Sequence, residues 1–284
     1  MPFIELLSAE STNNYALTQL HAGLTQHGTT FFAHEQTAGK GQRGKTWKAA
    51  KGSGIIVSVV INPHPLQLTQ QFYLSACIAL SVCEFFDQYA GGSTKIKWPN
   101  DLYWNDRKAG GILIENIIGK RKSDVRSQKY GVQSQEYEDR QTFEMGNPQV
   151  ASDPTSSRWL WAVAGIGINV NQTFFPDELT NAVSLKQITG RNYDPVNLAH
   201  ELCFFLDKNF KKLLSEGFED IYTSYLSQLY KKNEPVKLKK SNRVFEALIK
   251  SVSPGGELIV QHAIEERFQF GEIEWIIKAV KSKK

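Results

Sequence analysis

A run of eight mostly β-branched apolar residues, Gly54–Ile61 (GIIVSVVI), sets the strongest limit on the fold of this chain. Such a short and nearly continuous apolar run is typical of a buried strand. Leu68–Tyr89 follows with apolar residues at helical spacing, which predicts a helix. The chain has 284 residues, of which 41% are hydrophobic, enough for a sizeable core. Disordered and fibrous proteins are therefore excluded.

Further elements are predicted on both sides of this run. Strands are expected at Phe3–Leu7, Thr29–His34, Lys95–Trp98, Gly111–Ile117 and Trp159–Val170, and helices after Ser11, near Pro195–Leu214 and near Phe218–Tyr230.

The last part of the chain differs from the rest. From Pro235 onward the sequence has short alternating runs with a Pro-Gly-Gly turn, which predicts a small β-barrel. We therefore expect two units, residues 1–232 and residues 233–284. Gly119–Arg158 is polar, lacks sustained periodicity and lies between two predicted strands. It is interpreted as an insertion, either a mobile loop or a two-strand extension.

Charge, cysteine and histidine content exclude several classes of protein. Thirty-three basic and 29 acidic residues leave a net charge of +4, too small to indicate nucleic-acid binding by itself. The three cysteines form no CxxC pair and the six histidines form no HExxH motif, so neither a disulfide framework nor a zinc site is predicted. Acidic residues near the N-terminus argue against a signal peptide, and no apolar run is long enough for a membrane helix. We expect a cytoplasmic protein.

A glycine-rich basic loop, Gly39–Lys51, contains a match to the phosphate-loop pattern GxxxxGK[ST]. A phosphate loop should open a long helix whose N-terminal amides bind the phosphates, but only Trp47–Lys51 separates the match from the next predicted strand. We therefore expect an anion-binding loop formed by backbone amides with Lys40, Arg43 and Lys45, rather than a nucleotide hydrolase. A solvated basic loop is the alternative.

A second motif, Lys97–Leu102 (KWPNDL), is followed by Lys108–Glu115 (KAGGILIE). The proline should end the preceding strand, so that Asn100 and Asp101 come at its end, where sites of α/β proteins gather. Lys108 precedes a strand led by two glycines, which let a ligand approach the backbone. Each residue alone could be an ordinary surface residue, but together they indicate a site.

Two shorter segments allow more than one interpretation. Gly165–Asn171 (GIGINVN) contains a GxG pair but lacks the third glycine of a dinucleotide fingerprint, so it could line a site through Asn169 or form a tight turn. Ser11-Thr12-Asn13 could cap a helix or contribute polar groups to a pocket.

The four segments, in this order, resemble the biotin protein ligases, which are also called holocarboxylase synthetases. Members of this family carry an STN segment, a GRGRxGRxW loop, KWPNDL with a downstream KxxGIL, and GIGIN. The resemblance spans roughly residues 3 to 230. It implies an α+β fold with a mixed β-sheet flanked by helices, similar to class II aminoacyl-tRNA synthetases, in a catalytic domain over residues 1–232. Residues 233–284 would form a small SH3-like C-terminal β-barrel.

The resemblance implies an enzyme that uses ATP, biotin and Mg²⁺ to make biotinyl-5′-AMP and then transfers biotin to a lysine of a biotin carboxyl carrier protein. Lys108 would stabilise charge in the transition state, Asp101 would orient or deprotonate the incoming lysine, and Arg43 would assist catalysis. The implied biotin site consists of Ser11, Thr12, Asn13, Gln36, Lys40, Gly41, Gln42, Lys108 and Gly111. The implied ATP site consists of Lys40, Arg43, Lys45, Trp47, Asn100, Lys108 and Asn169, with Trp47 covering the adenine. The metal ligands are left open.

The basic loop departs from the family pattern. Lys40 and Lys45 replace arginines and lose the bidentate fork, while Gln42 replaces an arginine and loses the charge as well. Some family members carry an N-terminal DNA-binding domain, but here a catalytic-domain strand comes first, so DNA binding is not expected. We expect no membrane association, and a monomer or weak homodimer. A lipoate–protein ligase of the same fold, a phosphate-loop hydrolase and a non-catalytic biotin binder are the alternatives.

Overall fold

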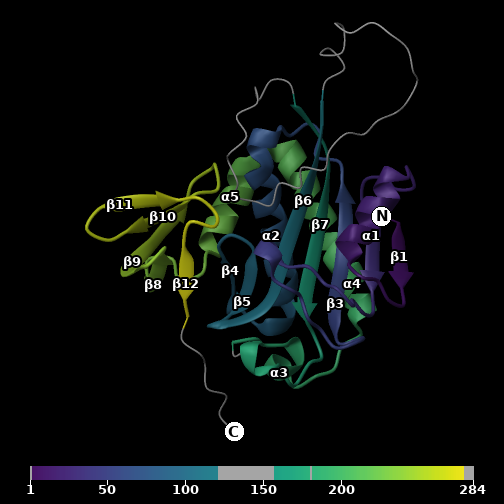
Figure 1. Cartoon of the computed structure of the whole chain (residues 1–284), viewed down its shortest axis with the longest axis horizontal. Coiled ribbons are helices and arrows are strands. Elements are labelled where there is room, and N and C mark those ends of the chain that lie inside the picture. Colours follow the sequence, from purple (N-terminus) through teal and green to yellow (C-terminus); the bar gives the residue numbers. More distant parts are fainter. Residues whose placement is uncertain (1, 121–156, 180, 278–284) are drawn as a thin grey trace, which may run out of the picture.

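The computed structural model describes residues 2–120, 157–179 and 181–277. Its main feature is a seven-stranded mixed sheet with the order β1-β2-β3-β7-β6-β5-β4 (Figure 1). β1 and β2 pair in parallel, and the other neighbours pair antiparallel. The strands are β1 (Phe3–Leu6), β2 (Thr30–Ala33), β3 (Gly54–Ile61), β4 (Thr94–Lys97), β5 (Asp101–Trp104), β6 (Arg107–Lys120) and β7 (Ser157–Asn169).

Helices cover both faces of this sheet. The helices are α1 (Thr12–His21), α2 (Gln71–Ala90), α3 (Leu185–Thr189), α4 (Pro195–Glu216) and α5 (Phe218–Ser227), with short 3-10 turns η1 (Gln42–Gly44), η2 (Leu68–Gln70) and η4 (Asp177–Leu179). α2 packs against α4 and α5 on one face, and α1 lies on the other, over β2, β3 and β7. The mixed sheet flanked by helices that the resemblance implies is confirmed.

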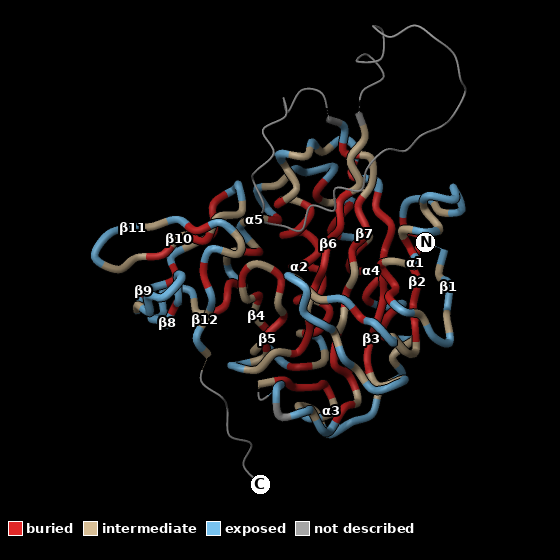
Figure 2. Tube along the Cα trace, in the orientation of Figure 1, coloured by how far each residue is buried: buried red, intermediate tan, exposed pale blue. Residues whose placement is uncertain are grey.

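Side chains alternate along the strands, so that one face of the sheet packs on the main core and the other packs on α1. In β3, Ile55, Val57 and Val59 belong to the main hydrophobic core under α2, whereas Val60 belongs to a second, smaller cluster under α1. Successive side chains of a strand point to opposite faces. Ser58 therefore lies on the α1 face, although it is as fully buried as its apolar neighbours. The whole of β3 is buried (Figure 2).

The long helix α2 follows from its composition. Its apolar side chains fill the main core, and it ends at Gly91, whose φ of +72° is in the left-handed region. Cys77 and Cys83 are free and buried in this helix. Burial raises the pKa of the Cys83 thiol to about 12 and raises that of Cys77 as well, so both cysteines are packing residues.

A second, antiparallel sheet has the order β11-β10-β9-β8-β12 and lies beside β4 and β5 (Figure 1). Its strands are β8 (Pro235–Lys240), β9 (Arg243–Val252), β10 (Leu258–Gln261), β11 (Glu265–Phe268) and β12 (Glu274–Ile276). It fits the SH3-like unit that the tail of the sequence indicated. The indole N–H of Trp98 donates to the carbonyl of Gly256 at 2.9 Å and thus links the two sheets. The division at residues 232 and 233 stays a prediction.

The structure differs from the sequence predictions in three places. A separate strand, β5, lies between the predicted strands near Lys95 and Gly111, so Asp101, which follows the end of β4 as predicted, also begins a strand. α3 was not predicted. The predicted ends of the insertion, Gly119 and Arg158, pair with each other at the end of the β6–β7 ladder, so both residues belong to strands and not to an insertion. Residues 121–156 lie outside the described part of the chain. None of the described helices has the length and apolar character needed to cross a membrane.

Candidate active site

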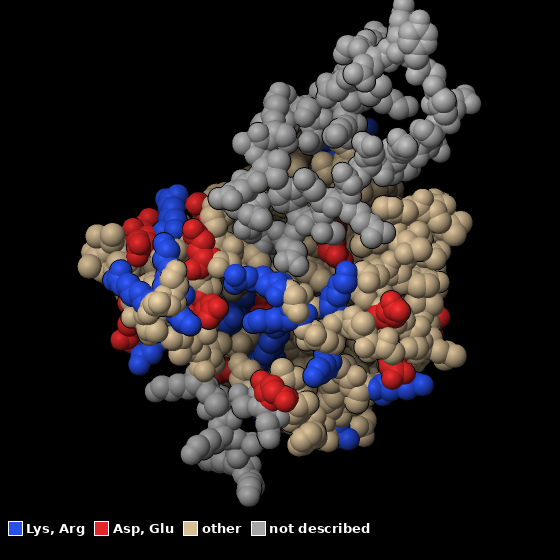
Figure 3. All heavy atoms as spheres, viewed as in Figure 1, with Lys and Arg blue, Asp and Glu red and all other residues tan. Residues whose placement is uncertain are grey.

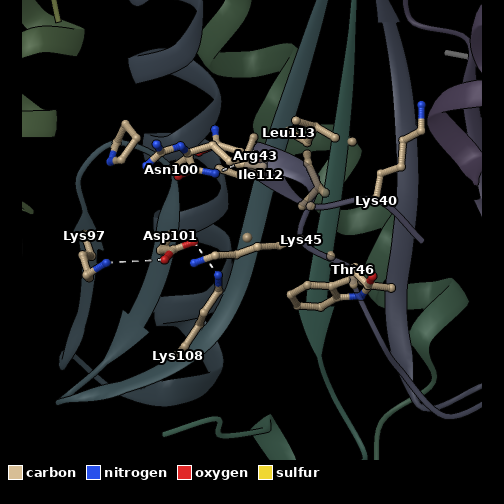
Figure 4. Close-up of a pocket in the computed structure, with 18 of the residues that line it drawn as sticks. Lys40, Arg43, Lys45, Thr46, Lys97, Asn100, Asp101, Lys108, Ile112 and Leu113 are labelled. Atoms are coloured by element: carbon tan, nitrogen blue, oxygen red, sulfur yellow. Dashed lines mark hydrogen bonds and ion pairs between the residues drawn. The ribbon is translucent and has the colours of Figure 1, made fainter. Parts of the chain in front are cut away.

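A cleft of about 770 Å³ opens on the sheet face opposite α2, next to the second sheet (Figure 4). This volume is in the range of small-ligand sites. Lys and Arg side chains gather in the middle of this face of the molecule (Figure 3). Every residue named above for catalysis, biotin binding or ATP binding lines the cleft. Their individual roles remain predictions.

The glycines of the GIGIN segment lie within β7, toward its C-terminal end, and are paired with β3 and β6, so the tight-turn interpretation is wrong. They are needed for close packing on the cleft face. A Cβ on Gly165 would come within 2.3 Å of Asn13 Oδ1, and a Cβ on Gly167 would come within 2.5 Å of the Trp47 indole. Both distances are too short for real Cβ contacts, so larger residues at these positions would displace side chains that line the cleft.

One end of the cleft is a hydrogen-bonded network of buried, mostly neutral groups. The backbone N–H and the hydroxyl of Thr12 both reach Gln36 Oε1, at 2.8 and 3.2 Å. The Ser58 hydroxyl is 2.8 Å from Thr12 Oγ1 and 2.6 Å from Asn13 Oδ1, and Asn13 Nδ2 donates to Glu115 Oε2 at 2.7 Å. With its carbonyl oxygen engaged, Gln36 keeps its amide N–H₂ as donors. Such an arrangement suits a ligand with fixed donors and acceptors.

Ser11 has both roles that the sequence left open. Its side chain caps α1 by accepting from the N–H of Asn14, and it also lines the cleft. The capping geometry holds Thr12 and Asn13 at the start of the helix, where both are buried. The cap therefore positions the polar network.

The basic loop crosses the cleft without opening a helix. Its only helical turn among the described residues is η1, and the chain then pairs back on itself, with the N–H of Trp47 donating to the carbonyl of Gly39. The phosphate-loop hydrolase is therefore excluded as a fold, as expected. Lys40 Nζ donates to Asn14 Oδ1 at 2.6 Å, and Arg43 adopts a left-handed φ of +56°.

The loop also reaches the second sheet. A side chain on Gly271 would lie 3.5 Å from the Arg43 guanidinium carbon, so the arginine rests against the turn before β12. The Trp47 indole packs on Gly167 of β7. The loop thus bridges the middle of the main sheet and the second sheet.

Lys108 and Asp101 form an ion pair at the centre of the cleft, with 2.6 Å between Nζ and Oδ1 (Figure 4). Simple alternation would point Lys108 and Gly111 to opposite faces of β6. The register between β5 and β6 shifts, however, so that Ala109 has no partner and forms a β-bulge. Because a bulge reverses the alternation locally, Lys108 lies on the cleft side with Asp101 and Gly111.

A second lysine reaches the same carboxylate. Lys97 Nζ is 3.6 Å from Asp101 Oδ2, and the Lys97 side chain is only 12% exposed. Burial by itself would raise the pKa of Asp101, but the ammonium groups of Lys108 and Lys97 outweigh it and hold the pKa below its usual value. Asp101 is therefore an ionised carboxylate between two cations.

Asn100 and Asn169 lie in the cleft wall with part of their hydrogen-bonding capacity already used. Asn100 Nδ2 donates to the carbonyl of Ile112, and Asn169 Nδ2 donates to the carbonyl of Val183. Both side chains are buried. These two hydrogen bonds stabilise the cleft wall independently of any ligand.

Several residues of the site had not been predicted. Ser58 is the one polar residue in an otherwise apolar strand, and this signal could have identified it. Lys97 and Glu115 belong to the recognised motifs but were given no role. Phe270, Gly271 and Trp275 line the cleft from the second sheet and carry no local sequence signal.

The described residues provide no preformed metal site, since nowhere do three His, Cys, Asp or Glu side chains lie close enough together to hold an ion. Mg²⁺ is commonly bound by one or two carboxylates together with substrate phosphates. The donor set of the cleft is compatible with Mg²⁺ that arrives with a nucleotide.

Comparison with known proteins extends these observations. The model of the biotin/lipoate A/B protein ligase family matches residues 6–127, which contain the polar network, the basic loop, Asp101 and Lys108. The chain belongs to the biotin/lipoate A/B protein ligase family. The prediction of this family from the four motifs is confirmed.

Relatives within the family differ in length. The bifunctional ligase/repressor BirA of Bacillus subtilis is 32% identical over 198 residues, which cover 68% of this chain and 49% of BirA. The chain thus spans about half the length of this curated relative. The biotin–[acetyl-CoA-carboxylase] ligase of Paracoccus denitrificans is 26% identical over 264 residues, with 90% of this chain and 92% of that protein covered.

Solved structures show the same fold. The biotin protein ligase of Aquifex aeolicus in complex with biotin and ATP aligns with a TM-score of 0.70 at 23% identity, covering 98% of this chain and 99% of that one. The alignment includes both sheets. The two-sheet arrangement therefore also occurs in that member of the family.

Proposed function

We propose that this protein is an ATP-dependent biotin protein ligase. The carboxylate of biotin attacks the α-phosphorus of ATP to give biotinyl-5′-AMP and pyrophosphate. The amine of a carrier lysine then attacks the biotinyl carbonyl, an amide forms and AMP leaves. The observation that carries this proposal is the distribution of charge in the cleft. A buried network of mostly neutral groups, with Lys40 beside its Glu115, lies at one end, and Lys108, Lys97 and Lys45 gather around Asp101 away from it.

The residues of the cleft suit the binding of biotin at one end and of the nucleotide phosphates at the other. Thr12, Asn13 and Gln36 offer donors and acceptors to the ureido ring of biotin, which is neutral. Lys108 would stabilise the charge that develops between the carboxylate and the α-phosphate. Lys45 and Arg43, with the loop amides, would bind the phosphates.

Trp47, Asn100 and Asn169 would complete the nucleotide site. Mg²⁺ bound to the triphosphate would neutralise part of its charge. It enters as part of the substrate.

The environment of Asp101 favours one of its two suggested roles. A general base works best when its pKa is near the working pH, but the two neighbouring ammonium groups hold the pKa of Asp101 below its usual value. Asp101 would therefore orient Lys108 and the incoming amine and would be a poor proton acceptor.

The carrier is proposed to be the biotin carboxyl carrier domain of a biotin-dependent carboxylase. Such a domain must present its lysine to the open side of the cleft. We further propose a monomer or weak homodimer that does not bind DNA and acts in the cytoplasm.

A direct assay tests the proposal. The protein is incubated with biotin, MgATP and a carrier domain, and the carrier is weighed by mass spectrometry. We expect the mass of the carrier to rise by one biotinyl group, and no rise when its target lysine is replaced by arginine. Release of phosphate without biotin would instead indicate a hydrolase.

A lipoate–protein ligase is the second candidate, because the family includes both activities. The dithiolane ring of lipoate has no hydrogen-bonding groups to match the pocket, whereas the polar network leaves the amide N–H₂ of Gln36 as donors that such a ring could not use. Calorimetric titration with biotin and with lipoate distinguishes the two. Tighter binding of lipoate would overturn the assignment to biotin.

A further inference from the structure

Lys97 is the least exposed of the cleft lysines that form ion pairs. Its side chain is 12% exposed, compared with 33% for Lys108 and 45% for Lys40. The Lys97 ammonium is 5.4 Å from the centre of the Tyr103 ring and 5.3 Å from the centre of the Trp275 ring. Both distances are within the range of cation–π attraction. Lys97 is therefore held between two aromatic rings.

These rings come from different sheets. Tyr103 belongs to β5, while Trp275 belongs to β12, which pairs with β8 of the second sheet. Tyr230 packs between them, with ring centres 4.9 Å from Tyr103 and 5.9 Å from Trp275. No described residue accepts a hydrogen bond from the buried Trp275 indole N–H, and the contact of this side chain with Lys97 is the cation–π contact of its ring. The second sheet thus completes an aromatic enclosure around this lysine.

The enclosure determines where the charge of Lys97 can act. A lysine side chain is flexible, and a free ammonium in this cleft would be attracted to any bound anion. Between the two rings it remains 3.6 Å from Asp101 Oδ2. Lys108 engages Oδ1, so the two oxygens of Asp101 have separate cationic partners.

We propose that Lys97 is a positioning residue of the ligase reaction, held by Trp275 of the second sheet so that it fixes Asp101 and, through Asp101, the ammonium of Lys108. The inference rests on the proposed function for its catalytic meaning. The second sheet would then take part in catalysis by completing the lysine's enclosure. Lys97 itself need not touch either substrate.

The first test compares Lys97→Met with Lys95→Met. Methionine keeps much of the apolar stem and removes the charge. Lys95 lies on the same strand, but its ammonium contacts Gln228 outside the cleft, so it is a matched control. We expect kcat for adenylation to fall roughly 10²-fold in Lys97→Met, the size of effect that a misplaced catalytic group can cause. The KM for biotin should be unchanged, and Lys95→Met should behave as the wild type.

The second test examines the ring. Trp275→Leu removes the π face and should lower kcat about tenfold, in line with the loss of one cation–π contact. Trp275→Phe keeps a π face and should restore most of the activity. Calorimetry with biotin, which binds at the far end of the cleft, shows whether each variant is folded. Equal losses in Trp275→Leu and Trp275→Phe would overturn the role assigned to the ring.

A third measurement does not depend on enzyme activity. The groups that face Asp101 are Lys97, Lys108, Lys45 and Tyr103. Removing the Lys97 charge leaves fewer cations to oppose burial, so the pKa of Asp101 must rise. Carbon-13 NMR of the carboxyl group should show this rise in Lys97→Met and not in Lys95→Met, and the acid limb of the pH–rate profile should move to higher pH.

The outcomes separate the two proposals. An unchanged Asp101 titration together with unchanged kcat in Lys97→Met would overturn the inference. If the wild-type protein makes no biotinyl-adenylate but Lys97→Met still raises the pKa of Asp101, the proposed function is overturned while the structural link between Lys97 and Asp101 stands.

Discussion

At the scale of single residues, the site is organised around one carboxylate and two lysines. Asp101 is ionised because Lys108 and Lys97 each approach one of its oxygens. The KWPNDL and KAGGILIE motifs identified Asp101 and Lys108 directly. The contact between Lys97 and Trp275 could not be predicted, because it joins residues from two sheets and, although Lys97 begins the KWPNDL motif, Trp275 carries no local sequence signal.

Lys108→Ala tests the central ion pair. The rate of adenylate formation, measured as pyrophosphate release, should fall roughly 10²–10³-fold, the usual cost of removing one group that stabilises transition-state charge. The melting temperature should change little, since the Lys108 side chain is one-third exposed and Lys97 still neutralises Asp101. Lys211→Ala, on the surface of α4, is the control. Near-normal pyrophosphate release from Lys108→Ala would contradict the assignment.

Gln42→Arg tests the departure of the basic loop from the family pattern. An arginine can form a charge-assisted hydrogen bond to a phosphate oxygen, worth about 1.5–3 kcal/mol, so release of biotinyl-adenylate should slow by roughly tenfold or more. Gln42→Lys restores the charge without the fork and should give an intermediate rate. The measurement is the dissociation rate of labelled adenylate. Identical rates in all three proteins would show that residue 42 does not hold the adenylate.

At the scale of elements, long periodic segments were predictable and short ones were not. β3 was predicted with its observed ends, and α2 and α4 within a few residues, because their apolar side chains repeat regularly over many positions. β5 and α3 have four and five residues. Segments of this length contain too little pattern, and their pairing partners or caps decide their structure.

The basic loop, Gly39–Lys51, provides a prediction at this scale. Its three glycines and its cations should leave it mobile in the protein without substrates, and it should order over biotin and the nucleotide. Its contacts in the structure, Lys40 to Asn14 and Trp47 to Gly167, are the positions at which ordering would fix it. Biotin and ATP should therefore bind with a favourable coupling of about 1–3 kcal/mol.

Calorimetry measures this coupling as the affinity for a non-hydrolysable ATP analogue with and without saturating biotin. Protease cleavage of the loop provides an independent readout. If affinity and cleavage are the same in both states, the loop is preformed and the coupling is absent.

At the scale of the whole molecule, the cleft needs both sheets. The sequence indicated a small β unit at the C-terminus, but nothing in its composition showed that Phe270, Gly271 and Trp275 would line the cleft. Docking of one unit on another depends on surface shape, which a single sequence does not reveal. The main sheet and its motifs were therefore predictable, and the contribution of the second sheet was not.

Residues 121–156 provide a prediction at the same scale. Lys120 and Ser157 are paired at the end of the β6–β7 ladder, so a two-residue Asn-Gly turn can join them. Replacing residues 121–156 with this turn should leave the biotinylation rate and the melting temperature close to the wild-type values, because this segment contains none of the four motifs. A loss of carrier affinity with unchanged adenylation would instead make the segment a docking element.

The β-bulge at Ala109 limits how this protein can change its length. Substitutions alter the cleft one side chain at a time, but an insertion or deletion of one paired residue between Asp101 and Gly111 reverses the facing of the residues beyond it. Removing the unpaired Ala109 is the exception, since it would make the ladder regular and leave Lys108 two positions before Gly111, with both still on the cleft face. The spacing of seven positions between the carboxylate and the lysine is therefore constrained by the pairing of β5 with β6, and the bulge adds one residue to the chain without moving either side chain to the other face.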